Sequence, residues 1–348
     1  MRVLIIKTSA MGDIIHALPV LDYLHQVSPG IKIDWVVEEQ FRDLLEGNPL
    51  IASLRLLRTR RWRKQLFNGT TVQEVLALRR ELQDQRYDIV FDIQGNLKSG
   101  IVAWATGCGK RLGFASDYLQ ERINARFITR QIPMRREDDS SSGRCLRIVS
   151  VPFGRDYRGM EIATDIFTGP EEERGAEELI RTCGEGPVFL FHPGTTWQTK
   201  FWSEDGWVGL GTRVANGFPG SEILLSWGNN SERESAERIA AALGERARVI
   251  ERYSLKGIAA VIKKVDVVIG GDTGLIHLAA AVGTPTVSYY RASDGSVSGP
   301  RGGQHVIVQS PLPCSRCQRT RCDKDDECRA SITPEAVYAG IVAIMGEG

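Results

Sequence analysis

The sequence lacks any run of about 18 uninterrupted apolar residues, the length that a membrane-spanning helix needs. We also expect no secretory signal at its start, because only the short apolar run 3–6 precedes Lys7 and no small-residue cleavage site follows. A membrane-spanning protein is therefore excluded, and we expect the chain to stay in the cytoplasm.

An excess of charge of one sign is also missing. The 44 Lys and Arg residues nearly balance the 43 Asp and Glu residues, for a formal net charge of +1. A dedicated nucleic-acid-binding protein is strongly basic, so no nucleic-acid partner is expected. Aromatic residues make up only 7% of the chain, but 42% of its 348 residues are hydrophobic. This composition is enough for roughly two globular domains without disulfides.

Short β-branched runs alternate with longer helical stretches, a pattern typical of parallel α/β layers. Strands are predicted at 3–6, 32–37, 88–93, 188–191, 223–226 and 265–269. Helices are predicted at 14–26, at 71–85 with Val75, Leu78 and Leu82 on one face, and after Thr333 with Val337, Ile341 and Ile344 on one face. The segment 135–185 is largely polar, so we place the linker within it and divide the chain into domains 1–165 and 166–348.

The turn after the first predicted strand, from Lys7 to Asp13, combines a glycine with hydroxyls and an acid. In an open α/β sheet this turn lies at the carboxyl ends of the strands, where ligands bind. Asp13 either caps the helix 14–26 or points into a cleft and takes a proton from a hydroxyl nucleophile. Gly12 would let a substrate approach the backbone closely, as the second interpretation requires.

Two later turns suit a phosphate group. The stretch 270–277, GGDTGLIH, follows a predicted strand, and the free N–H groups of the helix that begins there suit a phosphate or diphosphate. It matches neither the dinucleotide fingerprint nor the P-loop, and His277 either contacts a phosphate or is structural. In 192–202, HPGTTWQTKFW, two hydroxyls and Lys200 either hold a pyrophosphate and neutralise its charge as it leaves, or form a polar loop facing water.

At these residues the sequence resembles the ADP-heptose:lipopolysaccharide heptosyltransferases of glycosyltransferase family 9, and most closely the heptosyltransferase I group. The matching stretches, in order through both halves, are KTSAMGDIIHALPVL (7–21), DWVVEE (34–39), RRWRK (60–64), HPGTTWQTKFW (192–202) and GGDTGLIHLAAAVGTPTV (270–287). The resemblance implies an α/β fold of the GT-B type, with two Rossmann-like, doubly wound parallel-sheet domains facing a central cleft. It also implies an inverting glycosyl transfer that needs no catalytic metal or other cofactor.

The family's roles carry over to matching positions. They make 1–165 the acceptor-binding domain, with Asp13 as the general base, and 166–348 the nucleotide-sugar-binding domain, with Lys200 on the leaving-group side. The implied donor ligands are Thr195, Thr196, Glu232, Asp272, Thr273, Gly274, Leu275 and His277. The implied reaction moves L-glycero-D-manno-heptose from ADP-heptose to a Kdo residue of the lipopolysaccharide inner core, carried on a lipid A acceptor.

Six cations fall within ten positions around Trp62: Arg55, Arg58, Arg60, Arg61, Arg63 and Lys64. Such a run alone indicates a solvated face. With the resemblance, we prefer a surface that binds the phosphates and carboxylates of an anionic glycolipid, because arginine matches both groups in a bidentate manner. The acceptor ligands would be Arg60, Arg61, Arg63, Lys64 and Arg122. The same charges would hold the enzyme peripherally on the anionic inner face of the inner membrane.

Four of the seven cysteines, Cys314, Cys317, Cys322 and Cys328, lie close together near the end of the sequence. They could form a structural zinc site that begins with the C-x2-C pair. Reduced structural thiols and ready oxidation are the alternatives.

Three other functions remain open. The chain could be heptosyltransferase II or another family member that uses a heptosylated acceptor. It could be a nucleotide-sugar-binding protein without catalysis, although binding alone needs no base such as Asp13. It could also be a nucleotide-sugar epimerase of related architecture, which would form product without an acceptor.

Overall fold

The computed structural model describes residues 1–65 and 68–346, which form two compact units, Met1–Phe167 and Thr168–Gly348. The division lies within the predicted linker segment, two residues after the predicted boundary at 165/166. Among the described residues, no helix is both long and apolar enough to span a membrane.

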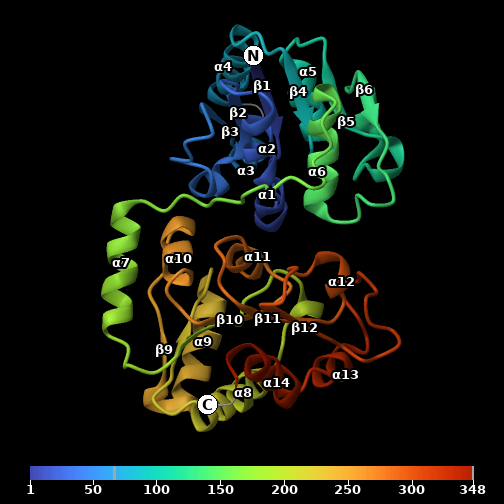
Figure 1. The fold of residues 1–348 in the computed structure, drawn as a ribbon. Coiled ribbons are helices and arrows are strands. Elements are labelled where there is room, and N and C mark those ends of the chain that lie inside the picture. The colour runs from blue at the N-terminus through green and yellow to red at the C-terminus, as the bar shows by residue number, and fades with distance from the viewer. Residues whose placement is uncertain (66–67, 347–348) are drawn as a thin grey trace. The chain divides into compact units, whose positions relative to one another are not determined.

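The first unit is a parallel six-stranded sheet with helices on both faces (Figure 1). Its strands are β1 (Arg2–Ile6), β2 (Lys32–Glu38), β3 (Ser53–Leu57), β4 (Ile89–Asp92), β5 (Arg111–Phe114) and β6 (Arg130–Ile132). Its helices are α1 (Met11–Ala17), α2 (Pro19–Val27), α3 (Thr59–Lys64), α4 (Gly69–Asp84), α5 (Leu97–Ala105) and α6 (Ser141–Ser150). Residues Val3 to Ile6 of β1 are fully buried, as expected for a central strand covered on both faces.

Two helix predictions in this unit need correction. The single helix predicted at 14–26 is two helices, α1 and α2, because Pro19 has no N–H to continue a helical ladder and instead occupies the first position of α2. In α4 the predicted apolar face is only partly buried. Leu82 is buried and Leu78 packs against the same core, whereas Val75 is 43% exposed.

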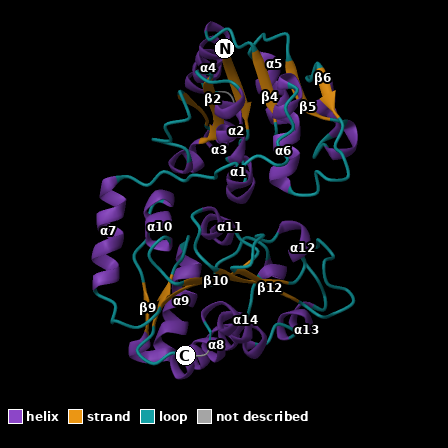
Figure 2. Cartoon of the chain, viewed as in Figure 1, coloured by secondary structure: helices purple, strands orange, loops and turns teal. Residues whose placement is uncertain are grey.

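The second unit repeats the architecture. Its strands are β7 (Val188–His192), β8 (Glu222–Leu225), β9 (Ala247–Val249), β10 (Val267–Gly271), β11 (Thr286–Tyr290) and β12 (His305–Gln309). Its helices are α7 (Pro170–Arg181), α8 (Glu204–Gly217), α9 (Asn230–Leu243), α10 (Leu255–Ile262), α11 (Gly274–Ala281), α12 (Gly295–Ser298), α13 (Asp325–Ala330) and α14 (Pro334–Met345). In Figure 2 the strands form a layer with helices on either side of it. Thr333 caps α14 as predicted, and Val337 and Ile341 are buried.

The two sheets have the same strand order. In the first it is β3-β2-β1-β4-β5-β6, and in the second β9-β8-β7-β10-β11-β12. Counted within each unit, both are the doubly wound order 3-2-1-4-5-6. The strand order reverses between β1 and β4 in one unit and between β7 and β10 in the other, so a ligand site is expected at the carboxyl ends of these strands.

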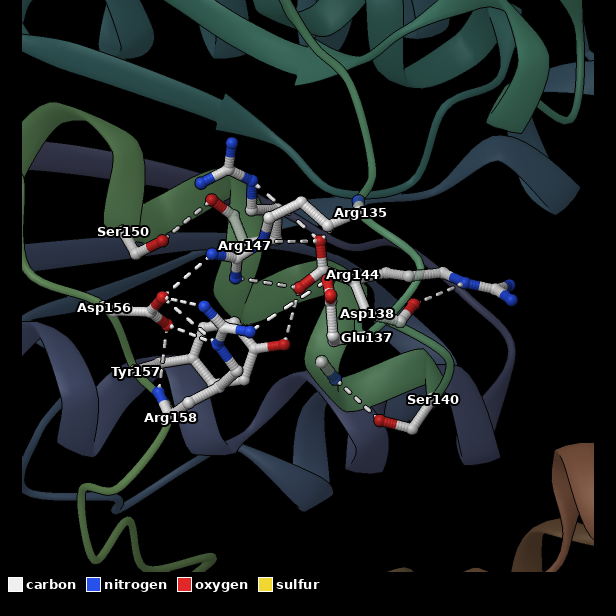
Figure 3. A network of polar contacts seen from close by, with 11 residues as sticks. Arg135, Glu137, Asp138, Ser140, Arg144, Arg147, Ser150, Asp156, Tyr157 and Arg158 are labelled. Atoms are coloured by element: carbon white, nitrogen blue, oxygen red, sulfur yellow. Dashed lines mark hydrogen bonds and ion pairs between the residues drawn. The ribbon is translucent and has the colours of Figure 1, made fainter.

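Part of the predicted linker belongs to the first unit. Ser140 caps α6 by accepting the N–H of Gly143, so the polar run before it leads into a packed helix. Figure 3 shows the charged network that ties this helix to the chain that follows it. At its centre the buried carboxylate of Asp138 accepts the backbone N–H of Arg135 (2.7 Å), the Arg135 guanidinium (3.0 Å) and the hydroxyl of Tyr157 (2.7 Å).

The Asp138 network predicts a pH-dependent stability. Burial alone would raise the pKa of Asp138, but the bonds from Arg135 and Tyr157 hold it below its ordinary value. Because the folded-state pKa is lowered, Asp138 stabilises the fold above its unfolded pKa of about 3.9, and this contribution disappears as the pH falls through the folded value. We expect Asp138→Asn to lower the free energy of unfolding at pH 7 by about 2 kcal/mol, with a shallower acid dependence than the wild type.

Urea unfolding between pH 3 and 7, followed by tryptophan fluorescence, measures this effect. The matched control is Asp84→Asn at the exposed end of α4, which should change the unfolding free energy by less than about 0.5 kcal/mol. Parallel pH curves for wild type and Asp138→Asn would contradict the prediction.

Candidate active site

The turn Lys7–Asp13 lies at the carboxyl edge of the first sheet, where hydrogen bonds from neighbouring strands hold it. The side-chain oxygen of Gln94, just after β4, accepts the N–H groups of Thr8 (3.0 Å) and Ser9 (3.2 Å). From β2, the Glu38 N–H donates to the carbonyl of Thr8 (3.1 Å). The buried Asp92 carboxylate in turn holds the backbone N–H of Gln94 (3.0 Å). The segments on either side of β1, from β2 and just after β4, therefore hold the turn in place.

Asp13 is not the N-cap of the helix. The helix begins at Met11, so Asp13 lies in its first turn, and its Oδ2 accepts the N–H of Ala10 (3.1 Å). Its Oδ1 is 4.0 Å from the buried ammonium of Lys7, and the side chain is 41% exposed. One oxygen thus orients the carboxylate while the side chain stays accessible to a substrate.

Sequence reasoning missed three residues around this turn: Lys7, Gln94 and Glu38. Lys7 is buried and donates to the carbonyl of Ile93 (3.1 Å), which places a positive charge beside Asp13. Lys7 and Glu38 fall within stretches quoted for the family resemblance, but nothing local in the sequence showed what they contact. A charged residue at the end of an apolar strand is the sequence signal that could have identified Lys7 and Glu38.

The basic segment begins at this same edge. The Glu38 side chain accepts the hydroxyl of Thr59 (2.6 Å) at the start of α3, and its backbone bonds the Asp13 turn. Helix α3 therefore starts close to that turn. Trp62 is half-buried against the core, and its indole donates to Glu74 of α4 (2.8 Å).

Only part of the basic segment is available to a ligand. Arg55 is paired with Asp34 (3.2 Å), Arg58 with Glu39 (2.7 Å) and Arg61 with Glu74. Arg60, Arg63 and Lys64 are exposed and form no ion pair with any other described residue. Arg122 is exposed in the 3₁₀ helix Arg122–Arg126, in another part of the same unit. Of the six cations around Trp62, the three that have no acidic partner among the described residues all lie on α3.

In the second unit, Lys200, Asp272 and His277 come together at the carboxyl ends of β7 and β10. The ammonium of Lys200 is 2.6 Å from Oδ2 of Asp272, and Nε2 of His277 is 3.6 Å from Oδ1. Burial alone would raise the pKa of Asp272, but contacts with His277 and Lys200 hold it well below its ordinary range. The carboxylate therefore stays ionised and fixes both neighbours at the start of α11.

The loop that carries Lys200 is anchored on both sides. Lys200 also lies over the ring of Trp197, 4.4 Å from its centroid, and the hydroxyl of Thr199 donates to the carbonyl of Arg319 (2.6 Å). Thr195 is half-buried and Thr196 is exposed, so both are accessible from solvent. Burial lowers the pKa of His192 to about 4, so this histidine is neutral near pH 7.

The start of α11 provides hydrogen-bond donors. Thr273 precedes Gly274, and the Thr273 hydroxyl is buried without a hydrogen-bond partner among the described residues. Leu275 and His277 are buried in the first turns. Gly270 and Gly271 are the last two residues of β10 and do not form the turn. A Cβ on Gly271 would lie 3.0 Å from the Tyr289 ring. Unpaired N–H groups of a first helical turn, beside an ammonium, suit a phosphate.

Glu232 has a structural role that the sequence did not show. In the first turn of α9 it accepts the backbone N–H of Gly228 (2.7 Å) and the side-chain amide of Asn229 (2.8 Å). A Cβ on Gly194 would lie 2.5 Å from the Glu232 carboxyl carbon, so this acid packs directly on the loop that leads to Thr195. The structure therefore places Glu232 beside the other predicted donor ligands.

The four C-terminal cysteines are unbridged thiols. Within residues 1–65 and 68–346, no three Cys, His, Asp or Glu side chains converge as a metal ion would need. The structure thus provides no ligand set for the predicted zinc site, and zinc binding stays a prediction that metal analysis can check.

Comparison with known proteins identifies the family. The model of glycosyltransferase family 9 (heptosyltransferase) matches residues 75–326. The chain is 35% identical to lipopolysaccharide heptosyltransferase 1 of Pseudomonas aeruginosa over 92% of this chain and 87% of that protein. It is 32% identical to lipopolysaccharide heptosyltransferase 1 of Escherichia coli K12, over 89% and 94% of the two chains.

A solved structure supports the same assignment. The E. coli heptosyltransferase WaaC with ADP aligns with a TM-score of 0.81 and 29% identity over 98% of this chain and 99% of that one. The two doubly wound sheets are thus the GT-B fold predicted from the sequence. This chain belongs to glycosyltransferase family 9, the heptosyltransferases.

Proposed function

We propose that this glycosyltransferase moves L-glycero-D-manno-heptose from ADP-heptose to a Kdo residue of the lipopolysaccharide inner core, with inversion at the anomeric carbon. The observation that carries the proposal is the Lys200–Asp272–His277 cluster at the start of α11, inside the region that matches family 9. The two relatives at 35% and 32% identity, both named heptosyltransferase 1, support the first heptose transfer rather than a later one.

The second unit would bind the donor. We assign the diphosphate to the first N–H groups of α11, the Thr273 hydroxyl, Lys200 and the hydroxyls of Thr195 and Thr196. Negative charge grows on the diphosphate as the bond to the anomeric carbon breaks, so a fixed ammonium stabilises the transition state more than the ground state. Asp272 acts through Lys200 and His277 by fixing their positions.

The first unit would bind and activate the acceptor. The Asp13 carboxylate is accessible, and it is oriented by the Ala10 N–H, which is what a general base for an acceptor hydroxyl needs. The exposed cations Arg60, Arg63 and Lys64 match the phosphates and carboxylates of a Kdo-containing lipid A acceptor. We propose that no metal or cofactor takes part, since an ammonium and N–H groups stabilise the leaving diphosphate and a carboxylate accepts the proton.

The direct test incubates the purified protein with ADP-heptose and a Kdo-terminated acceptor, a heptosylated acceptor or no acceptor, with a chelator present. Mass spectrometry should show one heptose added to the Kdo-terminated acceptor. Transfer only to the heptosylated acceptor would assign a later step, and a modified nucleotide sugar formed without acceptor would indicate an epimerase. Donor binding without turnover on any acceptor would indicate a nucleotide-sugar-binding protein without catalysis.

A prediction for the acceptor side follows from the exposed cations of α3. We expect Arg63→Gln with Lys64→Gln to raise the acceptor KM about tenfold at low salt without changing ADP-heptose affinity. Exposed charges are screened over a Debye length of about 8 Å at physiological ionic strength, so the two enzymes should converge as salt rises. Steady-state kinetics at two salt concentrations measures the effect, with Arg181→Gln on α7 of the other unit as the control.

Trp62→Ala separates packing from charge in the same segment. Because Trp62 packs on the core and bonds Glu74, its removal should lower the melting temperature, whereas the two charge changes should not. Equal acceptor KM values for the wild type and the Arg63→Gln, Lys64→Gln double variant at low salt would show that α3 is an ordinary solvated face that does not bind the acceptor.

A further inference from the structure

Helices α4 and α5 expose an unusual amount of apolar side chain. Of the 13 large hydrophobic residues that are exposed in the described chain, six lie on these two helices, with exposed fractions between 38% and 55%. We call them the α4–α5 surface: Val72, Val75, Leu76, Leu97, Ile101 and Trp104. The other seven are scattered, so this concentration needs an explanation.

The helical spacing places these residues on continuous faces. Leu97, Ile101 and Trp104 are spaced i, i+4, i+7 on α5, while Gly100 and Ala103 between them are buried. On α4, Val72, Val75 and Leu76 follow the same rule, and the next position on that stripe is Arg79. The helices therefore bury one face against the sheet and present a second apolar face outward.

The two outward faces form one surface. Helix α4 packs against α5, and the Arg79 guanidinium of α4 lies 5.9 Å from the centroid of the Trp104 ring of α5. At the other end of α4, Glu74 bonds Arg61 and Trp62 of α3. The α4–α5 surface is thus continuous with the helix that carries the exposed cations.

The charge on the α4 side of the surface is positive. Arg79 and Arg80 are exposed on α4, and neither forms an ion pair with another described residue. Of the acids nearby, Glu74 is held by Arg61 and Trp62, and Glu81 lies 3.7 Å from Arg55. The exposed Glu121 accepts the Leu97 N–H at the start of α5 (2.9 Å), and Asp84 lies at the end of α4. A second copy of the chain would bring arginines against arginines, whereas an anionic surface would be attracted.

We propose that the α4–α5 surface docks on the headgroup region of an anionic phospholipid bilayer, with Trp104 and Ile101 entering the interface and Arg79 and Arg80 on lipid phosphates. Aromatic rings with a polar atom favour the interface between water and hydrocarbon, and aliphatic side chains add buried apolar area there. The identity of the partner rests on the proposed function, since a lipid-linked acceptor brings the enzyme to a membrane.

Co-sedimentation with vesicles tests the proposal without donor or acceptor. The wild type should bind vesicles of phosphatidylcholine with phosphatidylglycerol and bind pure phosphatidylcholine weakly. Arg79→Gln with Arg80→Gln should lower the partition coefficient about 25-fold, because each cation near an anionic surface contributes roughly fivefold. Ile101→Ser with Trp104→Ser should lower it at least tenfold. Val297→Ser on α12, an exposed apolar residue of the other unit, should leave it unchanged.

Transfer to a water-soluble Kdo acceptor keeps this proposal separate from the proposed function. Both double variants should retain wild-type transfer rates and melting temperatures, because none of the four residues is assigned to donor or acceptor binding. Absence of wild-type binding to the anionic vesicles, or equal binding by all variants, would overturn the docking surface while leaving the enzymatic assignment in place. A dimer abolished by Ile101→Ser with Trp104→Ser would overturn it in favour of a second copy.

Discussion

Asp13→Asn is expected to lower kcat for heptose transfer by about 10²- to 10⁴-fold while ADP-heptose binding stays near wild type. The acceptor hydroxyl must lose its proton as it attacks the anomeric carbon, and a carboxamide cannot take that proton. Asp13 is suited to the role because its Oδ2 is fixed by the Ala10 N–H while the side chain remains 41% exposed. Asp13 lies at the start of α1, which follows β1 at the point where the strand order of the first sheet reverses.

The asparagine variant also separates catalysis from helix stability. Its carboxamide would retain an oxygen that can accept the Ala10 N–H, whereas Asp13→Ala removes both the base and this bond. We therefore expect both variants to lose turnover, and only Asp13→Ala to lose about 1 kcal/mol of unfolding free energy. Single-turnover kinetics, donor titration and thermal unfolding measure the three quantities. Near-normal turnover in Asp13→Asn would show that Asp13 only stabilises the start of α1 and is not the general base.

Lys200→Ala is expected to lower kcat by about 10²- to 10³-fold with a smaller rise in donor KM. Its ammonium has little solvent around it, with 15% of the side chain exposed, and it is held by Asp272 at 2.6 Å. A charge fixed in such surroundings stabilises the developing diphosphate without reorganisation. An unchanged kcat with only a raised donor KM would rule out this leaving-group role.

Removing Lys200 should also make the remaining activity sensitive to acid. Lys200 and His277 together keep the pKa of the buried Asp272 well below its ordinary range, so losing Lys200 lets burial raise it. The variant should then lose further activity as Asp272 takes up a proton at low pH, at values where the wild type does not. Lys200→Arg is the matched control, because it keeps the charge and should preserve the wild-type pH profile.

Several features of this protein could be predicted from local pattern. The strands near the centre of each sheet are buried on both faces and contain short runs of β-branched residues. These runs located β1, β2, β4, β7, β8 and β10 to within a few residues. The Thr333 cap with Pro334 marked α14. Strands β3, β5, β6, β9, β11 and β12 were not predicted. Of these, β5 (RLGF), β6 (RQI) and β9 (ARV) are only three or four residues long, and an arginine interrupts the apolar pattern of each. The motifs at the two switch points also identified the family, because their order spans both units.

Partners that are distant in sequence were decided only by the tertiary structure. Lys200 and Asp272 meet across 72 residues because β7 and β10 are parallel neighbours, and a residue pattern does not specify which strands pair. The contact of Gln94 with the Asp13 turn and the contact of Glu232 with Gly194 likewise join residues that are distant in sequence, so no local pattern predicts them. Sequence spacing counted six cations around Trp62. The pairing of β3 with β2 places Arg55 against Asp34, Arg58 just before α3 pairs with Glu39, and the packing of α3 on α4 places Arg61 against Glu74. Periodicity shows that a helix has an apolar face, whereas only the packed structure shows whether a neighbour covers it.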